Sequence, residues 1–376
     1  MGNAVTHLIC TVGTSYLNRL RASYDPLPDA PHIAVKESER TDEELKRDSA
    51  ELNSILCVLP QVGGKIEQID FFVSDTDDGR YMGELYKELL PRLLDGKRNS
   101  CKLKKVLITL IEDLKPIYNR FSPYGLKNLV VKMVERIRAI RERENGIVAI
   151  NATGGYKAQI SFAGLIGQVM GCDVWYQFED FKTAVRMPPM PVSYSIEDWL
   201  DNWEIFDALA DHDLLDPKEL GIKNPESFVS TAIGALFEYV ESEKVIYLNP
   251  VGQLFHEKFK EIVKREGAIC APKPRKGRWV DGIHDTPNYD KNVMAWLDKT
   301  CDDLNFIERR NSFAWSGPSL PRLKVKPGAT VKLIKVDIST EQATYPFEFV
   351  TTAATKREQS AAMHLVKEKL IGLMRL

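Results

Sequence analysis

Gly146-Ile147-Val148-Ala149-Ile150-Asn151-Ala152-Thr153-Gly154-Gly155-Tyr156-Lys157 is the stretch that decides the fold of the first half of the chain. Its apolar start predicts a buried strand, its polar middle predicts a tight turn, and the apolar spacing of 158–166 predicts a helix. Two glycines let the backbone approach a ligand closely, and free N–H groups at a helix start attract anions. Lys157 adds a positive charge there. The stretch predicts a strand–turn–helix unit whose turn either binds phosphate or has no ligand.

Two further apolar runs end in turns of the same kind. His7–Val12 is followed by Gly-Thr-Ser, and Ile69–Val73 is followed by Ser-Asp-Thr. In an open parallel sheet, ligands lie outside the carboxyl ends of the strands, so we expect the three turns to converge on one site. The chain has neither a Gly-x-Gly-x-x-Gly fingerprint nor a Walker-type loop, which favours a nucleotide-like or oligonucleotide ligand over NAD or ATP. The candidate ligand-binding residues are Gly13, Thr14, Ser15, Ser74, Asp75, Thr76, Asn151, Thr153, Gly154, Gly155 and Lys157.

The composition indicates a soluble chain of two or three domains, with 376 residues, 44% hydrophobic and 28% charged. No apolar run is long enough to cross a bilayer and no signal peptide is recognisable, so we expect a cytoplasmic protein without a membrane partner. The six cysteines and six histidines are scattered, which predicts neither a disulfide framework nor a metal site. We expect no cofactor.

Strand signals near 6–12, 67–74, 104–110, 146–151 and 172–178 alternate with helix signals near 41–58, 78–94, 126–143 and 157–170. This alternation predicts an α/β domain with a parallel sheet over residues 1–195. Residues 196–270 resemble a winged helix-turn-helix, and their acidic residues favour a dimerising or protein-docking role over DNA binding. The expected elements there are helices over 199–209, 227–243 and 253–265, and a strand over 244–248.

A basic, proline-rich linker precedes a third part, residues 271–376. A helix over 289–304, strands over 323–326, 330–338 and 347–353, and a closing helix over 359–373 predict a small α+β domain. From Arg275 to the end there are 17 Lys and Arg against 12 Asp and Glu; because the whole chain carries −2, residues 1–274 carry −7. A basic C-terminal module suggests contact with nucleic acid.

The first domain resembles the CARF family, the Rossmann-like sensors of type III CRISPR defence that bind cyclic oligoadenylates. The resemblance lies in Val12–Ser15, Val73–Thr76 and Asn151–Lys157, and covers about half of the chain. It implies a ring of 3′–5′-linked AMP units, with cyclic tetra-adenylate favoured, bound across the two-fold axis of a homodimer. Hydroxyls, backbone N–H groups and one lysine suit phosphates and ribose hydroxyls.

The last domain resembles the RelE family of toxin ribonucleases, which cut mRNA in the ribosomal A site. The resemblance is strongest at Ala354–Ser360 and extends to Arg322–Lys326 and Lys332. It implies a metal-independent endoribonuclease in which a ribose 2′-hydroxyl attacks the adjacent phosphate, with mRNA and the ribosome as partners. Arg357 and Lys332 would then clamp the transition-state phosphate.

The same resemblance assigns Arg322 and Lys324 to the RNA backbone, with Lys326 in support. Where the family often has a tyrosine, six residues after the arginine, this chain has Met363 followed by His364. His364 could supply the acid–base step instead, or be a surface histidine.

Two alternatives stay open. Arg357 and His364 also fit the Arg-x4–6-His signature of HEPN ribonucleases, which are all-helical and cut free RNA, although the β-branched runs before Arg357 argue against an all-helical module. A transcription regulator responsive to cyclic oligoadenylate is the non-enzymatic alternative. The acidic character of residues 240–261 argues against it, because neutralising phosphate dominates affinity for DNA.

Overall fold

The computed structural model describes residues 5–63, 66–94, 103–178, 181–189, 196–266, 272–284, 290–317 and 322–374. The chain forms two compact units. Unit 1 comprises Met1–Tyr194 and Leu209–Lys258, and unit 2 comprises Ser195–Ala208 and Phe259–Leu376. The segment expected to be a separate winged helix, 196–270, is thus divided between the two units.

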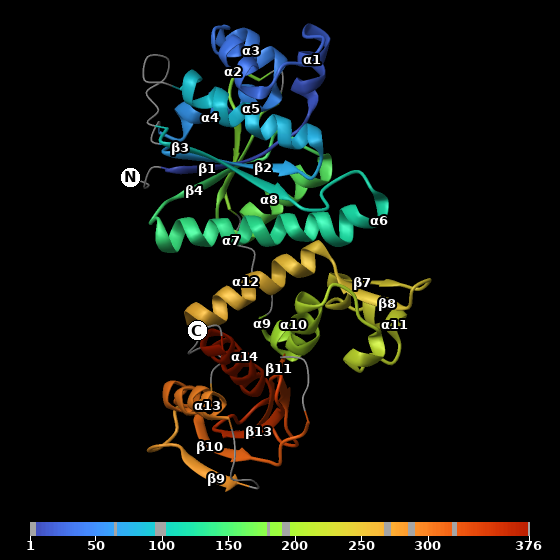
Figure 1. Ribbon diagram of the computed structural model, residues 1–376, viewed down its shortest axis with the longest axis vertical. Coiled ribbons are helices and arrows are strands. Elements are labelled where there is room, and N and C mark those ends of the chain that lie inside the picture. Colours follow the sequence, from blue (N-terminus) through green and yellow to red (C-terminus); the bar gives the residue numbers. More distant parts are fainter. Residues whose placement is uncertain are drawn as a thin grey trace. The chain divides into compact units, whose positions relative to one another are not determined.

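Unit 1 is built on a six-stranded sheet in the order β3-β2-β1-β4-β5-β6. Figure 1 labels the first four strands, β1 to β4. Strands β1 to β5 are parallel and β6 runs antiparallel to β5, so the predicted α/β fold with a mostly parallel sheet is confirmed. The central strands are fully buried because helices cover both faces of the sheet. The strands are β1 His7–Thr11, β2 Gln68–Ser74, β3 Lys105–Ile111, β4 Val148–Asn151, β5 Asp173–Tyr176 and β6 Val185–Met187.

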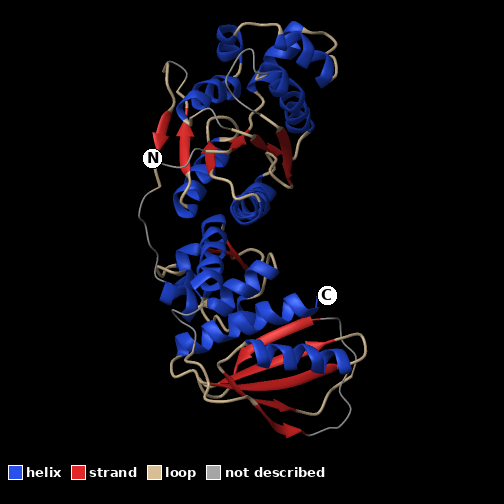
Figure 2. Ribbon diagram, turned by 90° about the vertical axis from the view of Figure 1, so that its left-hand side faces the viewer, coloured by secondary structure: helices blue, strands red, loops and turns tan. Residues whose placement is uncertain are grey.

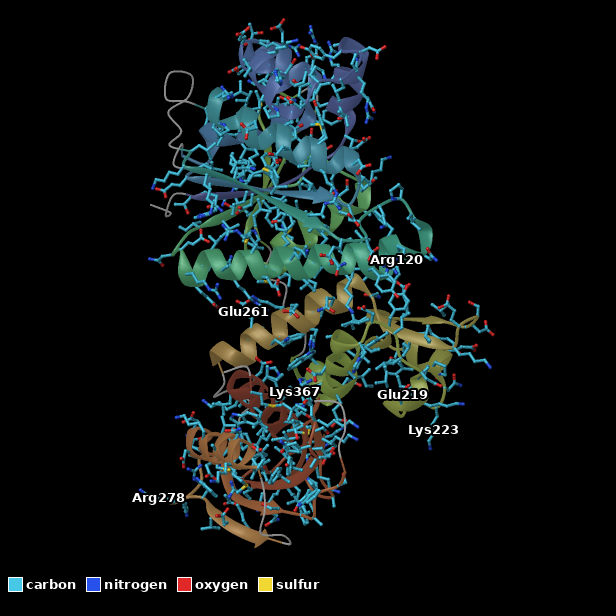
Figure 3. All side chains as sticks on the ribbon, viewed as in Figure 1. Arg120, Glu219, Lys223, Glu261, Arg278 and Lys367 are labelled. Atoms are coloured by element: carbon cyan, nitrogen blue, oxygen red, sulfur yellow. The ribbon has the colours of Figure 1, made fainter. Side chains whose placement is uncertain are left out.

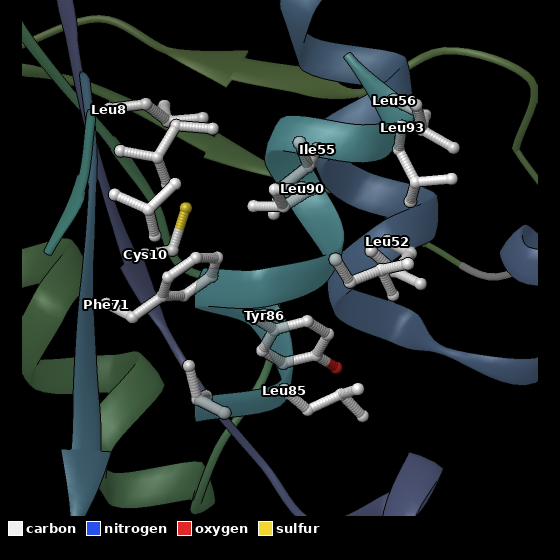
Figure 4. Close-up of a cluster of buried hydrophobic side chains, with 14 of the residues drawn as sticks. Leu8, Cys10, Leu52, Ile55, Leu56, Phe71, Leu85, Tyr86, Leu90 and Leu93 are labelled. Carbon is white, nitrogen blue, oxygen red and sulfur yellow. The ribbon is translucent and has the colours of Figure 1, made fainter. Parts of the chain in front are cut away.

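Helices of unit 1 bury an apolar core on each side of this sheet. One core joins β1 and β2 to the helices before β3; Figure 4 shows Cys10 and Phe71 of the strands facing Ile55 and Leu90 of the helices. The other core joins the sheet to α7 and α8. The helices are α1 Ser15–Ser23, α2 Ala30–Ser38, α3 Asp42–Asp48, α4 Ala50–Gln61, α5 Asp77–Leu93, α6 Tyr118–Arg120, α7 Lys127–Arg143 and α8 Lys157–Met170, with a π-helix at Phe121–Leu126.

The second segment of unit 1 corrects one prediction. Residues 227–243 are not one helix: α11 (Pro225–Val229) ends early, a 3₁₀ turn spans Gly234–Leu236, and β7 (Phe237–Val240) pairs with β8 (Val245–Leu248). The alternating Phe-Glu-Tyr-Val of β7 fits a strand, and Lys244 takes the left-handed conformation that closes the hairpin. The winged-helix assignment itself stays a prediction.

Two ion pairs join this segment to α7. Lys127, buried at the start of α7, donates to the Leu209 carbonyl at 3.2 Å and to Asp213 at 2.9 Å. Arg138 pairs with Glu257 of α12 (Pro250–Glu266) at 2.8 Å.

Unit 2 contains a five-stranded sheet in the order β11-β12-β13-β10-β9, drawn in red in the lower part of Figure 2. The three strands expected in this part of the chain form an antiparallel meander, β11 Arg322–Pro327, β12 Leu333–Ser339 and β13 Thr344–Thr351. Strands β9 (Val280–His284) and β10 (Ile307–Ser312) were not expected. A sheet of five strands contradicts the all-helical HEPN alternative for this part of the chain.

Five α-helical segments of the described residues complete unit 2. They are α9 Ile196–Asp201, the first part of α10 (Trp203–Asp211), the last part of α12, α13 Lys291–Asp303 and α14 Lys356–Met374. Helix α14 packs against β11, α13 and α9. Lys367 of α14, labelled in Figure 3, forms an ion pair with Asp207 of α10.

Candidate functional site

A pocket of about 360 Å³ opens at the carboxyl ends of β1, β2 and β4 in unit 1. It is built from the three strand-end turns that the sequence singled out, together with the start of α4. Its donors are hydroxyls, one side-chain amide and backbone N–H groups, which suit phosphate and ribose oxygens. The lining residues are Val12, Gly13, Thr14, Ser15, Asn18, Ala50, Glu51, Ser74, Thr153, Gly154, Gly155 and Tyr156.

The turn after β1 and the turn after β4 touch one another. A Cβ added to Gly13 would lie 2.9 Å from the backbone nitrogen of Gly155, closer than real Cβ atoms approach. Gly155 has a φ of +113°, a backbone conformation that residues other than glycine rarely adopt. Both glycines are therefore required for the close approach of the two turns.

Asn151 stabilises the turn after β4 through hydrogen bonds of its buried side chain. It is buried, donates to the Ser54 hydroxyl at 2.8 Å and accepts a hydrogen bond from the Thr153 hydroxyl at 2.8 Å. The Thr153 oxygen in turn accepts from the backbone N–H of Gln177 at 3.1 Å. Asn151 thus shapes the pocket without lining it.

Asp75 and Thr76 were expected in the site but serve the surrounding structure. The Asp75 carboxylate pairs with Arg80 at 2.6 Å and accepts from the backbone N–H of Asp113 at 3.2 Å. Thr76 caps α5 by accepting from the Gly79 N–H at 3.0 Å. Neither lines the pocket.

Lys157 is the first residue of α8 and is exposed, next to the lining residue Tyr156. It does not line the pocket itself. Seven of the expected residues do: Gly13, Thr14, Ser15, Ser74, Thr153, Gly154 and Gly155.

Glu51 is one of five lining residues that the sequence did not reveal; the others are Val12, Asn18, Ala50 and Tyr156. Glu51 lies in the first turn of α4, where an acidic residue is ordinary, and only the fold brings it beneath the glycine turns. It is 2% exposed, and its Oε1 accepts from the Gly13 N–H at 2.7 Å. Burial raises the pKa of Glu51, although hydrogen bonds from Gly13, Tyr86 and Ser49 oppose the rise.

A family model matches the part of the chain that holds most of this pocket. Residues 46–190 match the model described as CRISPR-associated protein (Cas_APE2256). The match includes Glu51 and the turns after β2 and β4, and covers less than half of the chain.

Three solved structures are similar over larger parts of the chain. Protein VC1899 from Vibrio cholerae is 9% identical over 93% of this chain and 78% of its own, with a TM-score of 0.26. Enterococcus italicus Csm6 bound to cyclic hexa-2′-fluoro-hexa-dAMP is 13% identical over 71% of this chain and 63% of its own, with a TM-score of 0.29. Can2 from Sulfobacillus thermosulfidooxidans in complex with cyclic tetra-adenylate is 10% identical over 81% of this chain and 87% of its own, with a TM-score of 0.26.

The second group of expected residues lies in unit 2, where β11, β12 and α14 meet. Gln359 of α14 donates to the carbonyls of Thr330 at 2.9 Å and Leu333 at 2.8 Å. Lys332 lies between these two residues and Arg357 lies two residues before Gln359, so the backbones of both lie near this junction. Both side chains are exposed.

The basic residues of β11 lie beside this junction. Lys324 is half-buried and Lys326 is exposed, whereas the side chain of Arg322 lies outside the described residues. Burial raises the pKa of Glu204 on α10, and the positive charges of Lys356 and Lys326 oppose the rise. Glu204 therefore lies within electrostatic reach of the start of α14 and of β11.

His364 occupies the interior instead of the basic surface, which corrects the expectation for this residue. It is 2% exposed, accepts a hydrogen bond from the Trp203 indole N–H at 3.2 Å, and contacts the rings of Trp199 and Trp203 edge-on. Burial lowers its pKa to about 3, and the charges of Lys260 and Lys367 act in the same direction. A neutral, enclosed imidazole cannot exchange protons with RNA, so His364 has a packing role.

Among the described residues, no group of His, Cys, Asp or Glu side chains could hold a metal ion. No helix there is long and apolar enough to span a membrane.

Proposed function

We propose that the pocket of unit 1 binds a cyclic oligoadenylate and that binding activates RNA cleavage by unit 2. The observation that carries the proposal is the convergence of three Gly/Ser/Thr turns on one pocket at the carboxyl ends of β1, β2 and β4. The similarity of residues 46–190 to a CRISPR-associated family supports the same ligand class.

The ligand proposed is cyclic tetra-adenylate, bound by two chains together. A pocket of about 360 Å³ is too small for a ring of four nucleotides, so each chain of a homodimer would hold one half of the ring. The exposed Lys157 would then contact phosphate at the edge of the pocket. The ring must bind the active arrangement more tightly than the resting one, since only differential affinity shifts an equilibrium.

The proposed reaction is RelE-type cleavage of mRNA. The ribose 2′-oxygen attacks the adjacent phosphorus, the bond to the 5′-oxygen breaks, and the products are a 2′,3′-cyclic phosphate and a 5′-hydroxyl. Arg357 and Lys332 would stabilise the charge that builds up on the phosphate oxygens. Arg322, Lys324 and Lys326 would bind the flanking RNA backbone.

The test is RNA cleavage with and without cyclic tetra-adenylate, on naked mRNA and on mRNA in stalled ribosomes. We expect cleavage only when both the ring and the ribosome are present. Ring-dependent cleavage of naked RNA would refute the ribosome requirement. No cleavage under any condition would refute the nuclease, and ring-dependent binding to duplex DNA would then favour the transcription regulator.

A further inference from the structure

Glu51 brings a carboxyl group into a pocket proposed for an anionic ligand. Its Oε1 accepts from the Gly13 N–H at 2.7 Å, and a Cβ added to Gly154 would lie 2.0 Å from the same oxygen. Its Oε2 lies 3.0 Å from the Tyr86 hydroxyl oxygen and 3.3 Å from that of Ser49. One carboxyl group thus contacts both glycine turns and forms part of the pocket wall.

No positive charge compensates this carboxyl group within the described part of the chain. Its polar neighbours there are a backbone N–H group and two hydroxyls. The other titratable groups that interact with it are Cys10 of β1 and Tyr86 of α5, and burial raises the pKa of each, so both stay neutral. The Arg residues near the start of α4 are engaged elsewhere: Arg19, Arg40 and Arg47 all pair with Asp48.

A phosphate held by the backbone of the glycine turns would lie next to Glu51. An ionised Glu51 would repel it, since two like charges at van der Waals distance interact strongly in a partly buried site. A protonated Glu51 removes the repulsion and still accepts from Gly13 with Oε1. The proton on Oε2 would be donated to the oxygen of Tyr86 or Ser49.

We propose that Glu51 is a specificity-determining residue of this pocket. The pocket binds an anionic ligand when the Glu51 carboxyl group takes up a proton. The inference rests on the proposed function, because it assumes that the anion is a cyclic oligoadenylate. It predicts that ring binding takes up protons and weakens as the pH rises. It also predicts that a neutral isostere of Glu51 binds the ring at least as tightly as Glu51 does.

The test is calorimetric titration of the full chain with cyclic tetra-adenylate, in buffers of different ionisation enthalpy, at several pH values. Wild-type protein should take up a proton, and its affinity should fall by up to about tenfold per pH unit where free Glu51 is ionised. Glu51→Gln keeps the acceptor for Gly13, so it should bind the ring at least as tightly as wild type, without the Glu51-linked proton uptake. Glu51→Ala removes the contact with both turns and should lose affinity at every pH.

The outcomes separate this inference from the proposed function. If Glu51→Gln binds the ring with the same proton uptake and pH dependence as wild type, Glu51 is only a structural brace and the inference is wrong. Weaker binding by Glu51→Gln than by wild type at neutral pH would also overturn it. If neither protein binds the ring at any pH, the proposed function fails and the inference fails with it.

Discussion

At the scale of single residues, Gly154 shows why the pocket needs a residue without a side chain. A Cβ there would meet Glu51 Oε1 at 2.0 Å, and the buried carboxyl group has little room to move. We expect Gly154→Ala to displace Glu51 or the turn and to lower the affinity for cyclic tetra-adenylate by at least about tenfold, equivalent to about 1.4 kcal/mol. Calorimetric titration measures the change.

Gly164 offers a matched control on α8. No atom lies within 4 Å of a Cβ added there, and the residue is inside a helix. Gly164→Ala should leave ring affinity unchanged and raise the free energy of unfolding by about 0.5–1 kcal/mol. Equal ring affinities for Gly154→Ala and wild type would show that the pocket is not the ligand site.

Lys157 is next to the pocket-lining residue Tyr156, and its substitution tests whether the ligand reaches the edge of the pocket. Its ammonium group is exposed at the start of α8, where it would form a charge-assisted contact with phosphate. We expect Lys157→Ala to weaken ring binding by about tenfold without changing the melting temperature. Lys87→Ala, at an exposed site on α5, is the control and should bind as wild type does. Unchanged binding by Lys157→Ala would remove Lys157 from the site.

His364 makes unit 2 sensitive to acid. Burial depresses its pKa to about 3, below the ordinary 6.5, so the unfolded chain binds more protons between these values. Stability is therefore complete above about pH 6.5 and falls as the pH drops towards 3. His364→Gln, which keeps an acceptor for Trp203, should flatten this fall in denaturant titrations between about pH 4 and 7. His32→Gln, at an exposed site, should not. An unchanged slope in His364→Gln would contradict the burial of the imidazole.

At the scale of elements, the sequence predicted what periodicity and turn chemistry encode. The five parallel strands of unit 1 and helices α5, α7 and α8 follow from apolar runs and from apolar residues at helical spacing. The helix expected over 41–58 is instead two helices, because the Ser49 hydroxyl accepts from the Leu52 N–H and begins α4 anew. That break also places Glu51 in the first turn of α4. Because the break was not predicted, neither the helix boundary nor the position of Glu51 in the pocket could be predicted.

Strand β10 could not be recognised from its sequence, Ile-Glu-Arg-Arg-Asn-Ser, which lacks a regular apolar pattern. Arg310 is nevertheless buried, because ion pairs with Asp298 and Asp281 at 2.5 Å and the ring of Trp279 compensate its charge. These partners come from α13, β9 and the loop before β9. Only the folded structure reveals such compensation, and the sequence pattern alone marks the strand as polar.

Helix α14 carries the most direct test of the proposed chemistry. We expect Arg357→Ala, at the exposed start of the helix, to reduce RNA cleavage by at least about a hundredfold, since it removes a charge that stabilises the transition state. Ring affinity should not change. Lys299→Ala on α13, where Lys299 forms an exposed pair with Asp303, is the control and should retain cleavage. Full activity of Arg357→Ala in single-turnover cleavage would refute its assignment.

At the scale of the whole molecule, the presence of a parallel α/β unit and a smaller mixed-sheet unit follows the prediction. The three domain ranges stay a prediction. The chain enters unit 2 at Ser195, returns to unit 1 at Leu209 and leaves again at Phe259. Composition and linker signals do not indicate such a return, because it depends on contacts between distant segments. Of the twelve residues that line the pocket, seven were named from the sequence and five were not, the buried Glu51 among them.

The central claim is that two chains share one cyclic oligoadenylate. The most direct measurement is the stoichiometry of cyclic tetra-adenylate binding by calorimetry, with the mass of the complex from light scattering. The account predicts one ring for every two chains, and a complex with the mass of a dimer. Binding of one ring by each chain of a monomer, or no binding of the ring, would contradict it.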